Sequence, residues 1–273
     1  MVSYFTHGPT LAYRTYGHGP LPLLAFHGFG RTGEDFHILE GPLGGLCTIY
    51  AFDLHYHGNS PSEPIRAERP YTPQELADYF TAFMDHLGAD KVLLLGYSFG
   101  GRTVLNLLEQ VPLRVERAFL AAPDGLKTRP WYRGLATSRF GRWLYKRFIT
   151  HPQRIHAVIH LLKAIRLMNE RMHRFLIGQT DTIEKRRLVH DVWLSYRRIE
   201  PDLATVAANA ERRGIPVHLF FGEFDRVIPG RLGQRLRKHA PETVSIQHLP
   251  LGHVLLTSEL GMAIATLLGA GRS

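Results

Sequence analysis

Residues 91–110 read KVLLLGYSFGGRTVLNLLEQ, and this stretch decides the fold. Its first part, Val92 to Leu95, is an apolar and partly β-branched run that predicts a strand buried on both faces. Its last part, Thr103 to Gln110, has apolar residues at helical spacing. Between them GYSFG at 96–100 is a G-x-S-x-G pattern, placed where the chain turns sharply from strand to helix. The stretch therefore predicts a strand–turn–helix unit inside an α/β sheet.

The serine of this turn, Ser98, is the candidate nucleophile. Such a turn holds the serine in a strained backbone conformation, and Gly96, Gly100 and Gly101 remove the β-carbons that would collide with neighbouring backbone. The hydroxyl then stands exposed at the carboxyl end of the strand. The alternative is an ordinary glycine turn in which Ser98 caps the helix. The strand before the motif and the helix after it favour the nucleophile.

The composition is that of a globular protein, with 44% hydrophobic and 21% charged residues in a chain of 273. Cys47 is the only cysteine, so no disulfide can form within the chain, and we expect it to be a packed core residue. The amino-terminal residues lack the basic and apolar regions of a secretory signal. No run reaches the roughly 18 apolar residues that suggest a membrane span. These features predict a soluble, cytoplasmic protein.

Strand-like and helix-like segments alternate through most of the chain. A hairpin is expected over 4–16, further strands over 22–26, 46–52, 92–95, 115–121, 215–221 and 244–249, and helices over about 72–87, 103–110, 230–239 and 258–268. Thr72, Pro73 and Glu75 form a start signal for the helix over 72–87. Such alternation is typical of a mostly parallel sheet with helices on both faces.

Residues 126 to about 210 break this alternation, because they show helical spacing and no strand pattern. We therefore expect a core domain of residues 1–125 and 211–273, and a helical domain of residues 126–210 inserted after the sixth strand. The insertion is strongly basic. Residues 126–200 hold 17 Lys and Arg against 5 Asp and Glu, a charge of +12 in a chain whose net charge is +9.

Four short sequences together resemble the α/β-hydrolase superfamily: HGFG at 27–30, GYSFG at 96–100, GEFDRVIP at 222–229 and LGH at 251–253. The resemblance covers essentially the whole chain. It implies the α/β-hydrolase fold, with the insertion as a helical cap that covers Ser98. It also implies an oxyanion hole made by the backbone amides of Phe29 and Phe99, with His27 and Gly28 in the supporting loop.

The sequence DLHYHGNS at 53–60 resembles the D-x-x-G-H-G-x-S turn of the same superfamily, with Tyr56 in place of its first glycine. We interpret Asp53 and His57 as residues that organise this loop. His55 and His57 also have the H-x-H spacing of some metal sites. No third cluster of ligands accompanies them, so no metal is expected.

In α/β-hydrolases the nucleophile, the acid and the histidine follow one another along the chain, and Ser98, Asp225 and His253 satisfy that order. Asp225 and His253 each follow a predicted strand, so a parallel sheet would bring them to the same edge as Ser98. Asp124, after the sixth strand, is the alternative acid, and Glu223 is a more distant one.

The turn at residues 96–100 is called the nucleophile elbow in this superfamily. A serine at the elbow predicts an acyl-enzyme and acyl transfer to water, whereas dehalogenases and epoxide hydrolases carry aspartate there. We therefore expect hydrolysis of a carboxylic ester in a small-molecule acyl substrate, with thioesters and C–C bonds as extensions, and no cofactor. One alternative is a lyase resembling the pyruvate-eliminating enzyme of menaquinone biosynthesis, in which Arg102 would contact the substrate carboxylate. Another is a non-catalytic ligand receptor on a hydrolase scaffold.

The basic insertion also carries aromatic residues among its arginines: Trp131, Tyr132, Phe140, Trp143, Tyr145, Phe148, Phe175, Trp193 and Tyr196. They fit a pocket for acidic acyl substrates, a surface that makes weak peripheral contact with anionic membrane, or a solvated basic face over an aromatic core. No recognition motif for nucleic acid accompanies the charge, so no nucleic-acid binding is expected. Substrate identity and oligomeric state stay open at this level.

Overall fold

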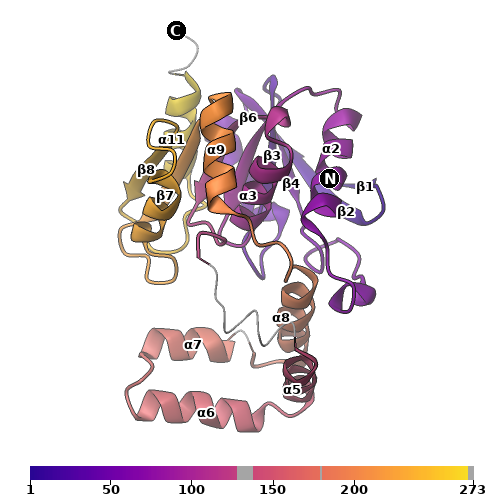
Figure 1. Cartoon of the computed structure of the whole chain (residues 1–273), viewed down its shortest axis with the longest axis vertical. Helices are drawn as coiled ribbons and strands as arrows, with labels where there is room; N and C mark the ends of the chain where they lie inside the picture. Colours follow the sequence, from indigo (N-terminus) through magenta and orange to yellow (C-terminus); the bar gives the residue numbers. More distant parts are fainter. Residues whose placement is uncertain (128–137, 179, 270–273) are drawn as a thin grey trace. The chain divides into compact units, whose positions relative to one another are not determined.

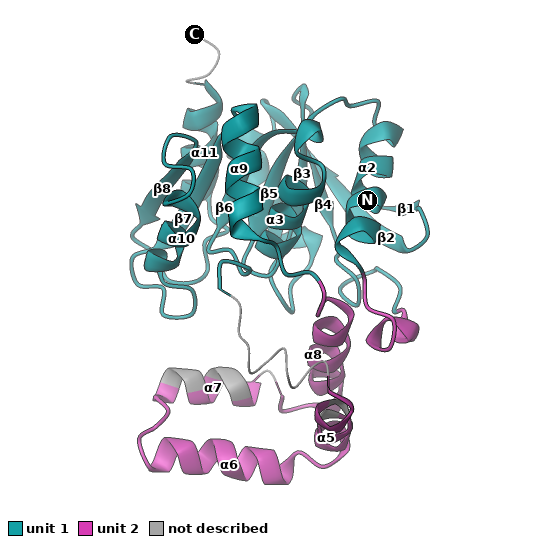
Figure 2. Cartoon of the chain, in the orientation of Figure 1, with its two compact units in different colours: residues 1–62, 72–128, 199–273 teal, residues 63–71, 129–198 magenta. Residues whose placement is uncertain are grey.

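The structure, a computed structural model, describes residues 1–127, 138–178 and 180–269. The chain divides into two compact units, coloured separately in Figure 2. Unit 1 consists of residues 1–62, 72–128 and 199–273, and unit 2 of residues 63–71 and 129–198.

The centre of unit 1 is an eight-stranded sheet (Figure 1). Its strands are β1 (Val2–Thr6), β2 (Thr10–Tyr16), β3 (Leu21–Phe26), β4 (Cys47–Phe52), β5 (Val92–Tyr97), β6 (Val115–Ala121), β7 (Val217–Gly222) and β8 (Val244–Leu249). Their order across the sheet is β1-β2-β4-β3-β5-β6-β7-β8. The hairpin pair β1–β2 and the pair β2–β4 are antiparallel, and the remaining pairs are parallel. Every residue of β5 is buried, as its apolar run predicts.

Helices cover the sheet of unit 1: η1 (Gly33–Leu39), α1 (Glu40–Leu43), α2 (Pro73–His86), α3 (Gly100–Gln110), η3 (Pro112–Arg114), α9 (Leu203–Arg213), η4 (Gly230–Gly233), α10 (Gln234–Arg237) and α11 (Ser258–Gly269). From β3 the chain moves first to β4 on one side and then to β5 on the other. Because crossovers between parallel strands are right-handed, the connections before and after this reversal lie on opposite faces. Accordingly α3 packs against α2 and α9, whereas α11 packs against α1 and η1.

The fold class predicted from the sequence is confirmed, and so is the start of α2. The Thr72 hydroxyl accepts from the Glu75 amide at 3.1 Å, and the Glu75 carboxylate accepts from the Thr72 amide at 2.9 Å. Cys47 is buried, as expected. The helix expected over 230–239 is instead a 3-10 turn followed by a four-residue helix. Gly230 and Gly233 disfavour a longer helix there.

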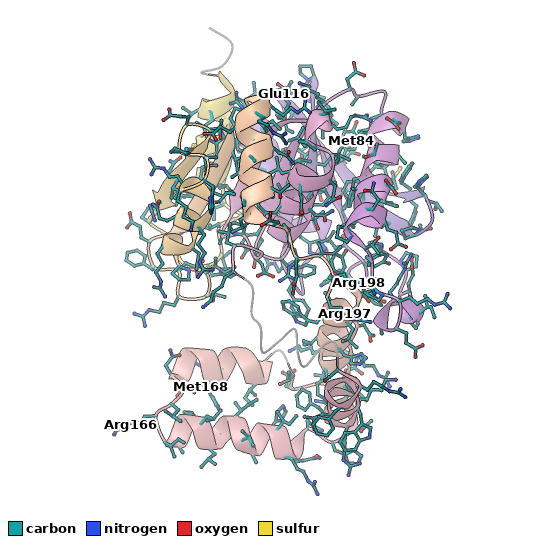
Figure 3. The ribbon with its side chains drawn as sticks, viewed as in Figure 1. Met84, Glu116, Arg166, Met168, Arg197 and Arg198 are labelled. Carbon is teal, nitrogen blue, oxygen red and sulfur yellow. The ribbon has the colours of Figure 1, made fainter. Side chains whose placement is uncertain are left out.

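Unit 2 is helical and contains η2 (Pro64–Ala67), α5 (Arg139–Thr150), α6 (Gln153–Ala164), α7 (Glu170–Gly178) and α8 (Ile183–Ser195). Within it α5 packs on α8 and α6 packs on α7. Arg197, which follows α8 and is labelled in Figure 3, donates to the carbonyl oxygens of Ala67 at 2.8 Å and Glu68 at 3.0 Å. These bonds attach residues 63–71 to the end of α8. No helix of the described residues is long and apolar enough to cross a bilayer.

The boundaries of unit 2 differ from the expected insertion of residues 126–210. Residues 63–71 join it, and α9 leaves it, because α9 packs on α3 in unit 1. The Asn209 side chain donates to the carbonyls of Leu108 and Glu109 at 3.1 and 3.0 Å, and Val206 is fully buried. Helical periodicity does not reveal which neighbour a helix packs against. Part of the expected insertion, with Trp131, Tyr132 and the side chains of Tyr145 and Phe175, lies outside the described residues.

Candidate active site

Ser98 occupies a strained turn between β5 and α3. Its φ of 48° lies in the left-handed region, which costs a residue with a β-carbon about 1–2 kcal/mol. Backbone hydrogen bonds hold it there: the Ser98 amide donates to Ala121 O at 2.9 Å, and the Ser98 carbonyl accepts from the Asp124 amide at 2.8 Å. A β-carbon on Gly100 would lie 2.0 Å from Phe26 O, so only glycine fits this turn.

Ser98, His253 and Asp225 form a hydrogen-bonded series at the carboxyl ends of β5, β8 and β7. The Ser98 Oγ lies 3.1 Å from His253 Nε2, and His253 Nδ1 lies 2.8 Å from Asp225 Oδ2. A carboxylate only accepts hydrogen bonds, so the proton of neutral His253 lies on Nδ1 and the Nε2 lone pair faces the serine hydroxyl. The structure thus brings together the three residues that the sequence nominates.

The Asp225 carboxylate is fully buried yet well supplied with donors. Its Oδ1 accepts from the amides of Val227 at 2.7 Å and Ile228 at 3.0 Å, and its side chain has 0% exposure. Burial alone would raise the pKa of Asp225, but the hydrogen bonds from His253 and the two amides outweigh burial and lower it. Asp225 is therefore ionised at neutral pH.

The two alternative acids are engaged elsewhere. Asp124 pairs with Arg102, whose Nη2 lies 2.7 Å from Asp124 Oδ2 and whose Nη1 donates to Ile199 O at 3.2 Å. Arg102 is only 9% exposed, so this is a largely buried ion pair. Glu223 is exposed, and no hydrogen bond joins it to His253 among the described residues.

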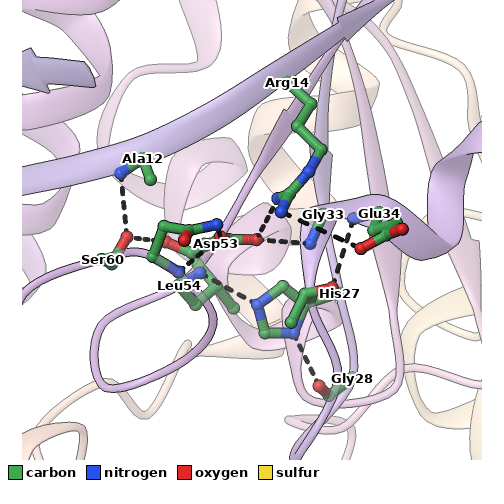
Figure 4. A network of polar contacts seen from close by, with 11 residues as sticks. Ala12, Arg14, His27, Gly28, Gly33, Glu34, Asp53, Leu54 and Ser60 are labelled. Carbon is green, nitrogen blue, oxygen red and sulfur yellow. Dashed lines mark hydrogen bonds and ion pairs between the residues drawn. The ribbon is translucent and has the colours of Figure 1, made fainter. Parts of the chain in front are cut away.

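The loop after β3 is held by two histidines that accept hydrogen bonds from backbone amides. Fully buried His27 accepts from the Leu54 amide at 2.9 Å through Nε2 and donates to Gly28 O at 2.7 Å through Nδ1 (Figure 4). His57 Nε2 accepts from the Gly30 amide at 3.0 Å. Burial lowers the pKa of His57, and it lowers that of His27 well below the ordinary value. Both rings are neutral and hold the backbone on either side of Phe29.

Gly28 lies directly against the elbow. A β-carbon there would meet the Tyr97 ring at 3.0 Å and Ser98 Cβ at 3.4 Å. The rings of Phe29 and Phe99 lie edge to face with centroids 6.5 Å apart, so the two residues nominated as oxyanion donors are neighbours. Their role as donors to a substrate remains a prediction.

Asp53 is the centre of a buried polar network under this loop (Figure 4). Its carboxylate accepts from the Arg14 guanidinium at 2.8 Å and from the amides of Gly33 at 2.7 Å and Asn59 at 2.8 Å. Arg14 was not nominated by the sequence reasoning, although it is the one charged residue of β2. Tyr56, in place of glycine, keeps the left-handed backbone with φ 68°. Among the described residues no cluster of His, Cys, Asp and Glu could hold a metal.

Tyr97 is the functional candidate that sequence reasoning missed. Its hydroxyl donates to the backbone carbonyl of His253 at 3.0 Å, and burial raises the pKa of Tyr97 to about 12. Only 5% of Tyr97 is exposed, so the phenol remains a donor at all ordinary pH values. The sole signal in the sequence is a hydroxyl at the end of an otherwise apolar strand.

The fold and this site define an α/β-hydrolase. The chain matches the alpha/beta hydrolase family over residues 23–262 and belongs to that family. It is similar to the uncharacterized hydrolase YugF of Bacillus subtilis, with 24% identity over 255 residues that cover 91% of this chain and 89% of that protein.

Two further likenesses are more limited. Over 110 residues, 40% of this chain, it is 34% identical to the dihydrolipoyllysine-residue acetyltransferase component of the acetoin cleaving system of Pseudomonas putida. That match spans only 29% of the relative's length. A solved thermophilic esterase from Thermogutta terrifontis shares the fold, with a TM-score of 0.67 at 19% identity over 100% of this chain and 97% of that chain.

Proposed function

We propose that this protein is a serine hydrolase that cleaves carboxylic esters of small molecules through an acyl-enzyme on Ser98. The observation that carries the proposal is the series from Ser98 to His253 to Asp225, with distances of 3.1 and 2.8 Å. Membership of the alpha/beta hydrolase family supports hydrolysis as the reaction class. The ester bond as its target is our inference from the serine nucleophile.

In the first half-reaction Ser98 Oγ attacks the ester carbonyl carbon while His253 Nε2 takes the hydroxyl proton. Ionised Asp225 stabilises the imidazolium that forms, because its carboxylate faces Nδ1 in a site with 0% side-chain exposure. The amides of Phe29 and Phe99 are the proposed donors to the carbonyl oxygen as it becomes negative. Preorganised donors of this kind lower a barrier by about 3–4 kcal/mol each.

The first half-reaction ends when His253 gives this proton to the leaving alcohol, and the acyl group stays on Ser98. In the second half-reaction a water molecule gives a proton to His253 Nε2 as its oxygen attacks the acyl carbon, and His253 then returns that proton to Ser98 Oγ as the carboxylic acid leaves. Only protons and the acyl group change places, so the reaction requires no cofactor.

Cys47 is the single cysteine of the chain and is buried. A chain that can form no disulfide within itself suits a reducing compartment, which supports a cytoplasmic location for this protein.

The lyase alternative loses its main support. It needs Arg102 at a substrate carboxylate, whereas Arg102 is 9% exposed and binds Asp124 and the carbonyl of Ile199. Cleavage of thioesters or C–C bonds would use the same triad, so a panel of matched esters, thioesters and β-diketones separates these substrate classes. The receptor alternative predicts no covalent chemistry at all.

A fluorophosphonate probe followed by intact-mass spectrometry tests the proposal. Ser245→Ala is a matched control, because Ser245 Oγ also lies 2.7 Å from a histidine nitrogen, His218 Nδ1. That pair lacks the carboxylate of a triad, because His218 Nε2 has no hydrogen-bond partner among the described residues. We expect one adduct on wild type and on Ser245→Ala, and none on Ser98→Ala. An adduct on Ser98→Ala, or none on wild type, would refute the nucleophile.

A further inference from the structure

Helix α5 lies in the most basic part of the chain. Residues 125–169 contain ten Lys and Arg and no Asp or Glu. Arg139, Lys146 and Arg147 of α5 are exposed, and no carboxylate of the described residues lies within ion-pair distance of them. The positive charge of α5 is therefore not neutralised by the described part of unit 2.

The same helix exposes two large aromatic side chains. Phe140 is 69% exposed and Trp143 is 56% exposed, and their rings stack with centroids 5.8 Å apart at 29°. Residues three apart lie on one face of a helix, and Arg147, four residues after Trp143, continues that face. Phe148 and Ile149 are buried, at 6% and 9% exposure, so packing within the chain uses another face of α5.

This pattern differs from that of Tyr71, Phe148 and Tyr196, which are buried aromatic residues of unit 2. Tyr196 is 1% exposed and packs on Tyr71 with centroids 5.6 Å apart. The stacked pair Phe140–Trp143 leaves more than half of each side chain in water, so it gains much less free energy of burial than Tyr196 does. Aromatic rings flanked by Lys and Arg are the composition of helices that lie in the interface of a bilayer.

We propose that the outer face of α5, formed by Arg139, Phe140, Trp143, Lys146 and Arg147, docks on an anionic lipid bilayer. The phenyl and indole rings enter the headgroup region, and the three cations bind lipid phosphates and carboxylates. Charge complementarity favours an anionic bilayer over a neutral one. The exposed ring pair favours a bilayer over double-stranded nucleic acid, whose phosphates attract cations but whose base faces are stacked inside the duplex. The proposal is independent of the reaction at Ser98.

Co-sedimentation with vesicles tests the docking face. The wild-type chain should bind vesicles of phosphatidylcholine mixed with phosphatidylserine, bind phosphatidylcholine alone weakly, and lose affinity at high salt. Each cation near the surface contributes about fivefold in binding, so Arg139→Gln with Lys146→Gln should weaken binding on the order of twentyfold. Phe140→Ser with Trp143→Ser should weaken it at least about tenfold, because the apolar insertion is lost.

Matched controls separate a specific face from general charge and folding effects. Arg237→Gln with Lys238→Gln removes the same two charges from an exposed site on unit 1 and should leave binding within about twofold. Leu113→Ser removes an apolar side chain that is 59% exposed in unit 1 and should also have no effect. Far-UV circular dichroism checks that each variant is folded.

Three results would overturn the proposal. Equal losses in the α5 and unit 1 charge variants would mean that net charge alone drives binding. Unchanged vesicle binding with a raised KM for a soluble ester in the aromatic variant would place the rings at a substrate entrance. Unchanged vesicle binding with loss of a dimer in sedimentation velocity would make the face a contact with a second copy.

Discussion

The pair Asp225→Asn and Asp124→Asn makes the same chemical change in two neighbouring loops, and the structure predicts opposite consequences. In Asp225→Asn the amide oxygen can still accept from Val227 and Ile228, but the amide nitrogen then faces His253 Nδ1. That nitrogen is a donor, so the ring must carry its proton on Nε2. The protonated Nε2 can no longer take the proton of Ser98.

The size of the loss follows from this wrong tautomer. A serine enzyme whose histidine is held in the wrong tautomer loses kcat on the order of 10⁴-fold, equivalent to about 5 kcal/mol of transition-state stabilisation. KM should change little, because no group that binds the ground-state substrate is removed. The free energy of unfolding should fall by less than about 2 kcal/mol, since two backbone donors keep their acceptor.

Asp124→Asn should have the reverse profile. It leaves the guanidinium of Arg102, 9% exposed, with a neutral partner, so the free energy of unfolding should fall by about 1–3 kcal/mol. Its kcat should stay within about tenfold of wild type, because Asp124 does not contact His253. Steady-state hydrolysis of a short p-nitrophenyl ester and urea denaturation measure both quantities. A larger loss of kcat in Asp124→Asn than in Asp225→Asn would refute the assignment of the acid.

Three further expectations concern the surroundings of the triad. Tyr97→Phe removes the donor to the carbonyl of His253, and we expect kcat to fall about fivefold at constant KM. An unchanged kcat would show that this hydrogen bond does not position His253. Gly28→Ala places a β-carbon 3.0 Å from the Tyr97 ring and should lower kcat by about tenfold to a hundredfold, whereas Gly41→Ala, with nothing within 4 Å, should be silent. Burial lowers the pKa of His57 in the folded chain below the ordinary 6.5 that it has in the unfolded chain. Below about pH 6.5 the unfolded chain therefore binds more protons than the folded chain, and the free energy of unfolding falls as the pH drops. Urea denaturation at about pH 7 and 5 should show this fall, and His57→Gln should make it shallower; an equal fall in the variant would contradict the assignment.

Local sequence was sufficient to predict most of the strands and helices of unit 1 and the turn at residues 96–100 that carries Ser98. An apolar run without alternation, as in Val92 to Leu95, is compatible only with a strand covered on both faces or a buried helix, and the glycines after it decide in favour of a strand. The chain order of Ser98, Asp225 and His253 could be read directly, because each follows a strand and parallel strands end at one edge. Short-range spacing and steric restriction are properties of a few neighbouring residues, so one sequence reveals them.

Selection among equivalent candidates required the folded chain. Asp124 and Asp225 both follow strands, and two contacts that no spacing reveals separate them: Asp225 bonds to His253, and Asp124 pairs with the buried Arg102. The same holds for α9, which is helical by pattern but packs on α3, and for the hydroxyl of Tyr97, which meets a carbonyl 156 residues away.

The aromatic residues of unit 2 illustrate the physical reason most directly. Phe140 and Phe148 stand on one helix among arginines, and sequence gives both the same hydrophobicity, yet one is 69% exposed and the other 6%. Composition determines how much apolar surface a segment carries. Which part of that surface is covered depends on the neighbours that the tertiary fold brings to it, because burial is a property of contacts between distant segments rather than of residues.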